Sequence, residues 1–110
     1  MKQRAIILVD FDPTMDREQA EYRPAVVISQ TVYNEKRNMV FICPITSNTR
    51  PLRFRVQLDD RTQTQGDILC EQVRVIDLLA RECRVVEELP DDLLKRVLEV
   101  VGVIIAIEQL

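Results

Sequence analysis

Short apolar runs rich in β-branched residues, separated by polar loops, make up the chain as far as Pro90. Runs of this kind predict β-strands. We expect strands over residues 5–9, 25–28, 39–43, 52–58, 68–76 and 83–86. The first is expected to be buried on both faces, because nearly every residue in it is apolar. Ser29 is expected to cap a short helix within 31–38, and one helical turn is expected at 78–82.

Two of these runs carry a more specific pattern. Residues 52–58 alternate apolar and polar positions, which predicts a half-buried strand with Arg53 and Arg55 on its outer face. Residues 68–76 predict one long strand. The residues expected to share a face of that strand are Cys70, Gln72 and Arg74.

The segment after Pro90 has the period of a helix. Pro90 suits the first helical position, and Asp91 and Asp92 suit the positive end of the helix dipole. Its apolar side chains form two adjacent stripes that span an arc of roughly 220°, more than packing on one sheet requires. They are Leu93, Leu94, Val97, Leu98, Val100, Val101, Val103, Ile104, Ile105 and Ile107. The surplus favours a subunit interface, and a helix set deep in its own core is the alternative.

Strands that follow one another without long helical crossovers predict a mainly antiparallel, partly closed sheet with a helix last in the sequence. The chain has 110 residues and shows neither a linker nor an internal repeat. We therefore expect a single domain over residues 1–110. The first residues lack the pattern of a signal peptide, and no apolar run reaches the length of a membrane span, so we expect a cytoplasmic protein without a membrane partner.

The composition limits the partners, the acid–base residues and the metal ligands that the protein can use. The formal net charge is −3, so a nucleic-acid partner would need a local cationic cluster rather than a global basic field. Histidine is absent, which removes the commonest acid–base residue and the commonest metal ligand. Cys43, Cys70 and Cys83 lack metal-ligand spacing, so we expect free, mostly buried thiols and neither a metal nor another cofactor.

Residues 18–29 join a polar loop to an apolar strand. Pro24 biases Arg23 toward an extended backbone, so Arg23 is expected at the junction of loop and strand. A cation held at such a junction suits chemistry on an anion. An ordinary surface ion pair between Arg23 and Glu18 or Glu21 is the alternative.

Five short motifs occur in a fixed order along almost the whole chain, from about Ile6 to the C-terminal helix. They are Val9-Asp10-Phe11-Asp12-Pro13-Thr14, Glu18-Gln19-Ala20, Arg23-Pro24-Ala25-Val26-Val27-Ile28-Ser29, Pro44-Ile45-Thr46-Ser47 and Glu71-Gln72-Val73-Arg74. Together they resemble the MazF/Kid/PemK family of ribonuclease toxins. The chain departs from that family in two places: Arg4-Ala5 stands where a Gly-Asp pair is usual, and the charged residues of 15–21 replace a glycine-rich loop.

The resemblance implies a small, mainly β, SH3-like antiparallel barrel of about five to seven strands with short helices and a C-terminal helix. It further implies a homodimer that cuts single-stranded RNA without a metal and is held inactive by a cognate antitoxin. Carried over by position, Arg23 and Thr46 are the catalytic pair, and Glu18 and Gln19 belong to the loop that shapes the site. The residues expected to bind substrate or support the site are Gln19, Tyr22, Ser47, Arg53, Arg55, Gln72 and Arg74, with Tyr22 the ring most favourably placed for stacking.

Metal-free RNA cleavage requires a deprotonated 2′-hydroxyl, a stabilised negative charge at phosphorus and a protonated leaving oxygen. Arg23 can stabilise the charge through paired N–H donors, and Thr46 can give one hydrogen bond to the phosphate. The general base is left open between Glu18, another carboxylate and Arg23 itself, because a guanidinium is effectively never neutral near pH 7. The mechanism requires that Arg23 and Thr46 meet in one cleft.

Two functions without catalysis remain open from the sequence. One is a gyrase poison resembling CcdB, which has the same fold. That relative depends on residues of the C-terminal helix, commonly including Trp, and this chain has no Trp. The other is a degenerate family member that binds an antitoxin without turnover.

Overall fold

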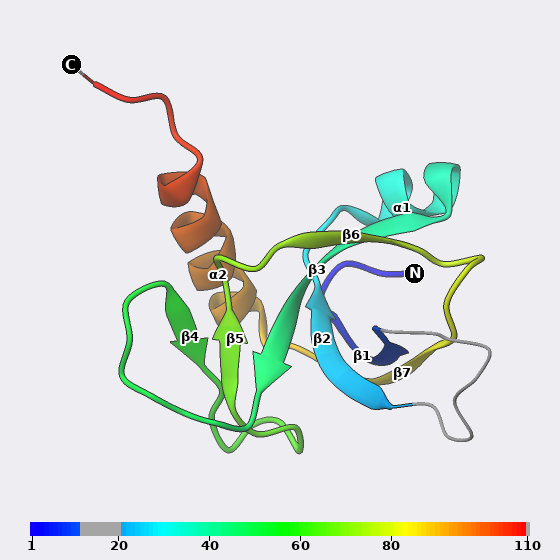
Figure 1. The fold of residues 1–110 in the computed structure, drawn as a ribbon, viewed down its shortest axis with the longest axis horizontal. Helices are drawn as coiled ribbons and strands as arrows, with labels where there is room; N and C mark the ends of the chain where they lie inside the picture. The colour runs from blue at the N-terminus through cyan, green and yellow to red at the C-terminus, as the bar shows by residue number, and fades with distance from the viewer. Residues whose placement is uncertain (12–20, 110) are drawn as a thin grey trace.

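The structure is a computed structural model that describes residues 1–11 and 21–109. Its elements are β1 (Ala5–Asp10), β2 (Tyr22–Val27), α1 (Thr31–Arg37), β3 (Met39–Thr46), β4 (Arg55–Gln57), β5 (Asp67–Leu69), β6 (Arg74–Asp77), β7 (Cys83–Glu88) and α2 (Asp91–Ile104) (Figure 1). All the described strand pairs are antiparallel, which confirms the predicted mainly antiparallel β fold with a C-terminal helix. Neither described helix has the length and apolar character that crossing a bilayer requires.

Strand β3 is the centre of the sheet. The strand order is β4-β5-β3-β2-β1-β7, and β6 pairs with β3 outside this path. The first half of β3 pairs with β6, its last two residues pair with β5, and β2 lies along its other side. Three strands are therefore positioned by contact with this one, and the end of β3 is where they converge.

The sheet separates two apolar cores, because successive side chains of a strand point to opposite faces. The core beneath α2 includes Ile6, Val26, Cys43, Ile45, Val56, Ile68, Leu93, Leu94 and Val97. The core on the other face includes Ala5, Ile7, Val9, Ala25, Val27, Val40, Ile42 and Ile76. β1 thus lies between β2 and β7 with both faces covered, as its apolar sequence predicts.

The strand expected over residues 52–58 is mostly absent. Phe54 has φ 69°, in the left-handed region, so the backbone turns there and the alternation stops. Only Arg55–Gln57 pairs as a strand, and Leu52 is exposed while Val56 is buried. The alternating pattern identifies the buried residue correctly, but it does not reveal the turn that precedes it.

The single strand expected over residues 68–76 is two strands, β5 and β6. A turn separates them, in which the Gln72 amide donates to the Leu69 carbonyl at 3.1 Å. The turn contains the polar residues Glu71 and Gln72 but neither glycine nor proline, so the residues that usually mark a turn are absent from it. The helical turn expected at 78–82 is one hydrogen-bonded turn, from the Ala80 amide to the Asp77 carbonyl at 3.1 Å.

Both helices are capped differently from the prediction. α1 begins after Gln30 rather than Ser29. Ser29 serves another purpose, since its hydroxyl bonds the buried side chain of Asn34 and accepts from the Phe41 amide at 2.9 Å. Pro90 is the N-cap of α2, one residue before the expected position.

Arg4 opens β1 in an unusual backbone conformation. Its φ is 80°, in the left-handed region where a glycine is favoured. The side chain compensates, because Arg4 Nε donates to the Leu89 carbonyl at 3.0 Å and Arg4 Nη2 donates to Glu88 at 3.0 Å. Arg4 therefore fastens the start of β1 to the end of β7.

The loop of residues 59–66 is anchored to β7 through Glu87. The Glu87 carboxylate accepts from the Gln63 amide at 3.0 Å and from the amide and hydroxyl of Thr64 at 2.7 Å each. Burial alone would raise the pKa of Glu87, but these hydrogen bonds outweigh it and lower the pKa. The charged carboxylate is therefore the form that holds the loop.

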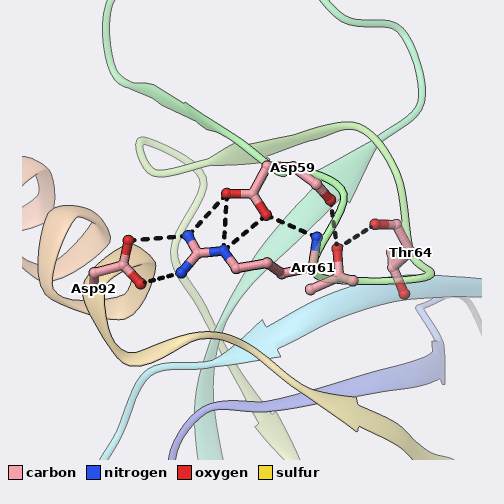
Figure 2. Close-up of polar contacts among 5 residues, drawn as sticks. Asp59, Arg61, Thr64 and Asp92 are labelled. Atoms are coloured by element: carbon pink, nitrogen blue, oxygen red, sulfur yellow. Dashed lines mark hydrogen bonds and ion pairs between the residues drawn. The ribbon is translucent and has the colours of Figure 1, made fainter.

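The same loop is tied to the first turn of α2. Figure 2 shows the Arg61 guanidinium between two carboxylates, 2.8 Å from Asp59 and 2.8 Å from Asp92. The three groups are at least partly exposed, so each pair contributes little stability by itself. Their planar, forked geometry still restricts the loop to one position.

Gly66 ends this loop directly against the end of β3. Its φ is +129°, and a Cβ built there would lie 2.0 Å from the Thr46 carbonyl oxygen. The Gly66 carbonyl accepts from the Leu58 amide at 2.9 Å, which closes the loop. Only glycine permits this approach of two backbones.

We expect Gly66→Ala to lower the free energy of unfolding by at least about 2 kcal/mol, because it combines a strained φ with a backbone collision. The matched control is Gly102→Ala, since nothing lies within 4 Å of a Cβ at Gly102 in α2. That substitution should raise the free energy of unfolding by about 0.5–1 kcal/mol. Urea unfolding at one fixed protein concentration measures both, and equal effects of the two substitutions would contradict the assignment.

We expect Glu87→Gln to destabilise the protein by about 1 kcal/mol at pH 7, because the amide cannot accept all the loop's hydrogen bonds. The folded pKa of Glu87 lies below its ordinary 4.5, so its contribution is complete above pH 4.5 and is lost as the pH falls through the folded value. The difference between variant and wild type should therefore narrow at low pH. Urea unfolding across this pH range measures the free energy of unfolding of both proteins, with Glu35→Gln on α1 as the control. If the free-energy difference between Glu87→Gln and wild type did not change with pH, the ionised contact would be contradicted.

Candidate active site

A cleft of about 460 Å³ opens where β2 begins and β3 ends. Its walls come from both strands, from β5 and β6 and from four connecting segments. The lining residues are Phe11, Arg23, Pro24, Pro44, Ile45, Thr46, Ser47, Gln65, Leu69, Gln72 and Arg74. Among these described residues the charged ones are Arg23 and Arg74, so the cleft favours an anion although the whole chain is acidic.

Strand pairing brings Arg23 and Thr46 together. β2 and β3 pair with Ala25 opposite Pro44 and Val26 opposite Cys43. Two residues further along the same register, Arg23 comes opposite Thr46 on the same face of the sheet. Both line the cleft, so the requirement that they share one cleft is met.

Arg23 lies within β2 rather than at a junction of loop and strand. β2 begins at Tyr22, and Arg23 pairs with Val9 of β1. A rigid strand therefore holds its backbone, while its side chain is 69% exposed. The carboxylate of Glu21 is 3.6 Å from the Arg23 guanidinium. This exposed ion pair is one of the two surface pairs that the sequence offered as the alternative for Arg23. A phosphate can displace the Glu21 carboxylate, because it offers two oxygens to the guanidinium.

Thr46 is the last residue of β3, opposite Asp67 of β5. Its hydroxyl oxygen accepts a hydrogen bond from the Asn48 amide at 3.2 Å. A hydroxyl that accepts this bond still has its own hydrogen to donate. Thr46 is half-buried, so that donor is fixed at the wall of the cleft.

Arg74 and Phe11 form the opposite part of the lining. The guanidinium carbon of Arg74 lies 5.0 Å from the centre of the Phe11 ring, in the range of a cation–π contact. Phe11 also packs on the core that contains Ile7 and Ile42. The ring therefore gives the cleft an apolar surface and holds the second cation beside it.

Tyr22, the ring predicted for stacking, lies elsewhere. Its hydroxyl bonds the Glu82 carboxylate, and it shares a separate pocket with Cys83 and Arg84. The hydrogen bond to Glu82 raises the pKa of Tyr22. Neighbouring residues of a strand face opposite sides, which explains why Tyr22 is turned away from the cleft that Arg23 lines.

Several other predicted site residues, including the catalytic candidate Glu18, divide into three groups. Ser47 and Gln72 line the cleft together with Arg74. Arg53 is exposed and outside the cleft lining. Glu18 and Gln19 lie outside the described residues. The roles assigned to these residues stay predictions.

Arg55 occupies a neighbouring pocket of about 400 Å³, also lined by Arg50 and Arg96. Its guanidinium is 3.2 Å from the buried carboxylate of Asp67 and 2.9 Å from the Asn48 carbonyl. Such a pair is costly to break, because the Asp67 charge would be left buried alone. Arg55 thus supports the loop after β3, and its predicted contact with substrate stays untested.

The sequence does not assign six of the lining residues to the site: Phe11, Pro24, Pro44, Ile45, Gln65 and Leu69. Phe11 belongs to a motif but was not assigned to the site, and Gln65 belongs to none of the motifs. The available signal for Gln65 is the glycine that follows it in a polar loop, which marks a backbone position of close approach.

The cysteines are free, and burial raises the pKa of Cys43 to about 12 and that of Cys70 to about 11. These two are core thiols, as predicted, and Cys83 is partly buried. Over residues 1–11 and 21–109, no group of three or more Cys, Asp or Glu side chains is arranged to hold a metal ion.

Comparisons with known proteins agree with this geometry. The family model of the PemK-like, MazF-like toxin of type II toxin–antitoxin systems matches residues 2–105. The chain is 42% identical over 76 residues to the endoribonuclease toxin MazF of Escherichia coli strain K12, covering 69% of this chain and 68% of that protein. It is 32% identical over 102 residues to the endoribonuclease PemK of Escherichia coli, covering 89% and 77%.

Solved structures show the same fold. MazF of Deinococcus radiodurans matches with a TM-score of 0.82 and 28% identity over 94% of each chain. A MazE–MazF structure from the same organism matches with a TM-score of 0.85 and 26% identity, again over 94% of each chain. The chain belongs to the family of PemK-like, MazF-like toxins of type II toxin–antitoxin systems.

Proposed function

We propose that this protein is a sequence-selective endoribonuclease toxin that cleaves single-stranded RNA without a metal and thereby inhibits translation and growth. The relatives MazF and PemK of Escherichia coli are named as endoribonucleases. The observation that carries the proposal is the shared cleft of Arg23 and Thr46, with Arg74 as a second cation. The products have 2′,3′-cyclic phosphate and 5′-hydroxyl ends.

The chemistry follows from the donors in the cleft. The 2′-oxygen attacks phosphorus, its proton passes to a base, and the 5′-oxygen leaves with a proton. The Arg23 guanidinium binds two phosphate oxygens through its parallel N–H groups, and the Thr46 hydroxyl donates to one of them. Both donors are in place before the charge develops, so little reorganisation is needed in the transition state.

The general base remains open between three groups. The described lining of the cleft contains no carboxylate. Two carboxylates are candidates. The Glu21 carboxylate is 3.6 Å from the Arg23 guanidinium, and Glu18 is close to Arg23 in the sequence. Arg23 itself is the third candidate, although a guanidinium rarely loses its proton.

We expect Arg23→Ala to lower cleavage of a long mixed-sequence RNA at least about 100-fold, because it removes the paired donor to the developing charge. Arg23→Lys should retain an intermediate rate, since it keeps the charge without the fork. Arg37→Ala, in the last turn of α1, is the matched control and should cut like wild type. Mapping of product ends in buffer containing EDTA is the measurement.

Two outcomes contradict this mechanism. One is that EDTA abolishes cutting by the wild type. The other is that growth arrest survives both Arg23→Ala and Thr46→Ala, which would support a poison of the gyrase-inhibiting kind.

The proposal includes a homodimer formed through the C-terminal half of α2. Leu93, Leu94 and Val97 in the first half are buried, whereas Leu98 is 39% and Ile104 is 42% exposed. Figure 1 shows this half of α2 extending beyond the strands. An exposed apolar stripe continuous with a buried one suits a second copy of the chain. A cognate antitoxin, as in the MazE–MazF structures of Deinococcus radiodurans, is the other proposed partner, and the cytoplasm is the proposed location.

We expect Leu98→Asp to raise the dissociation constant of the dimer at least about 100-fold, because an unpaired carboxylate in an apolar contact costs several kcal/mol. Lys95→Asp introduces the same side chain at an exposed polar position of α2 and serves as control. Light scattering across a dilution series measures the oligomeric state, and thermal unfolding verifies that each variant is folded. A dimer unaffected by Leu98→Asp would place the interface on another surface.

A further inference from the structure

Gln65 is the residue of the 59–66 loop that lines the cleft. Its neighbours on both sides are fixed. Thr64 is held by two hydrogen bonds of 2.7 Å to Glu87, and the backbone of Gly66 lies against the Thr46 carbonyl. The loop thus presents one side chain to the Arg23–Thr46 cleft from a backbone that has little freedom to move.

The polar lining of the cleft includes two cations, the hydroxyls of Thr46 and Ser47, and the side-chain amides of Gln65 and Gln72. Arg23, Arg74 and the hydroxyl of Thr46 suit phosphate oxygens, which are the same in every nucleotide. The side-chain amide of Gln65 is neutral and offers an acceptor beside two donors. This pattern complements the edge of a nucleobase, where donors and acceptors are also adjacent.

A base has a place to lie in the same cleft. The Phe11 ring supplies an aromatic face, and Arg74 lies against that ring with its guanidinium. Unstacked bases of single-stranded RNA bind aromatic or guanidinium planes by stacking, which leaves their edges open to hydrogen bonding. The amide of Gln65 lines the same space as this platform.

We propose that Gln65 is a specificity-determining residue, whose amide hydrogen-bonds the edge of a base next to the scissile phosphate. The inference rests on the proposed RNA-cleaving function. It differs from the roles of Arg23 and Thr46, because the contact selects which RNA sequence is cut and takes no part in the chemical step.

Gln63 offers a matched control within the same loop. It is exposed, it has the same side chain, and it lies outside the cleft lining. Only its backbone amide is needed to hold the loop, through the bond to Glu87 at 3.0 Å. Gln63→Ala and Gln65→Ala therefore remove the same group from a position outside the cleft lining and from a position within it.

The first experiment maps the cut sites of wild type, Gln63→Ala, Gln65→Ala and Gln65→Glu on single-stranded RNA randomised around the cut. We expect Gln65→Ala to weaken the base preference at one flanking position at least about 5-fold, with the chemical ends of the products unchanged. Gln65→Glu removes the donors and should shift that preference toward bases that present a donor. Gln63→Ala should keep the wild-type preference.

A uniform loss of rate with an unchanged base preference in Gln65→Ala would overturn the inference, because it indicates a structural role. An equal shift in Gln63→Ala would overturn it as well, because the effect would then belong to the loop as a whole. Thermal unfolding of each variant establishes that the cleft is intact.

The second experiment separates this inference from the proposed function. Short RNAs with a 2′-deoxy sugar at the cut site lack the nucleophile, so their binding is measured without cleavage. Base-selective binding that Gln65→Ala removes supports the inference even in a protein that cuts nothing. If cleavage shows a base preference that does not depend on Gln65, the proposed endoribonuclease function holds and the inference about Gln65 is wrong. Binding without any base preference would also contradict the inference.

Discussion

The register between β2 and β3 is the constraint on which the site depends. Continued two residues beyond the Ala25–Pro44 pair, it brings Arg23 opposite Thr46, although the two residues belong to separate motifs. A slip of one residue would turn Arg23 toward the core and leave the cleft without its main cation. The two apolar cores oppose such a slip, because it would move the side chains of each core to the opposite face, where the packing is different.

An acidic chain forms a cationic cleft here because several of its carboxylates are engaged elsewhere. Asp67 neutralises Arg55, and Asp59 and Asp92 share Arg61. Glu87 is occupied by the amides of the 59–66 loop. Local pairing of this kind leaves Arg23 and Arg74 as the charges that line the cleft, so net charge is a poor guide to what the protein binds.

Hydrophobic period and motif order predict much of this architecture. The apolar run at β1 predicts burial on both faces, and the helical period after Pro90 predicts α2. The prediction fails where one backbone angle decides the outcome, as at Phe54 with φ 69°, because side-chain pattern does not encode that angle. The pairing of Arg23 with Thr46 follows from the motifs, whereas Gln65 enters the cleft through a close backbone contact at Gly66 that no pattern of side chains reveals.

Arg4 makes the opening residues of the chain part of its structure. The first residues of most domains are loosely held, and they are the usual place for trimming or fusion. Here the guanidinium of Arg4 bonds the carbonyl of Leu89 and the side chain of Glu88, just before α2 begins. Removal of four residues at one end would thus loosen the base of the helix near the other end. The start of β1 and the start of α2 are therefore held together, although they lie far apart in the sequence.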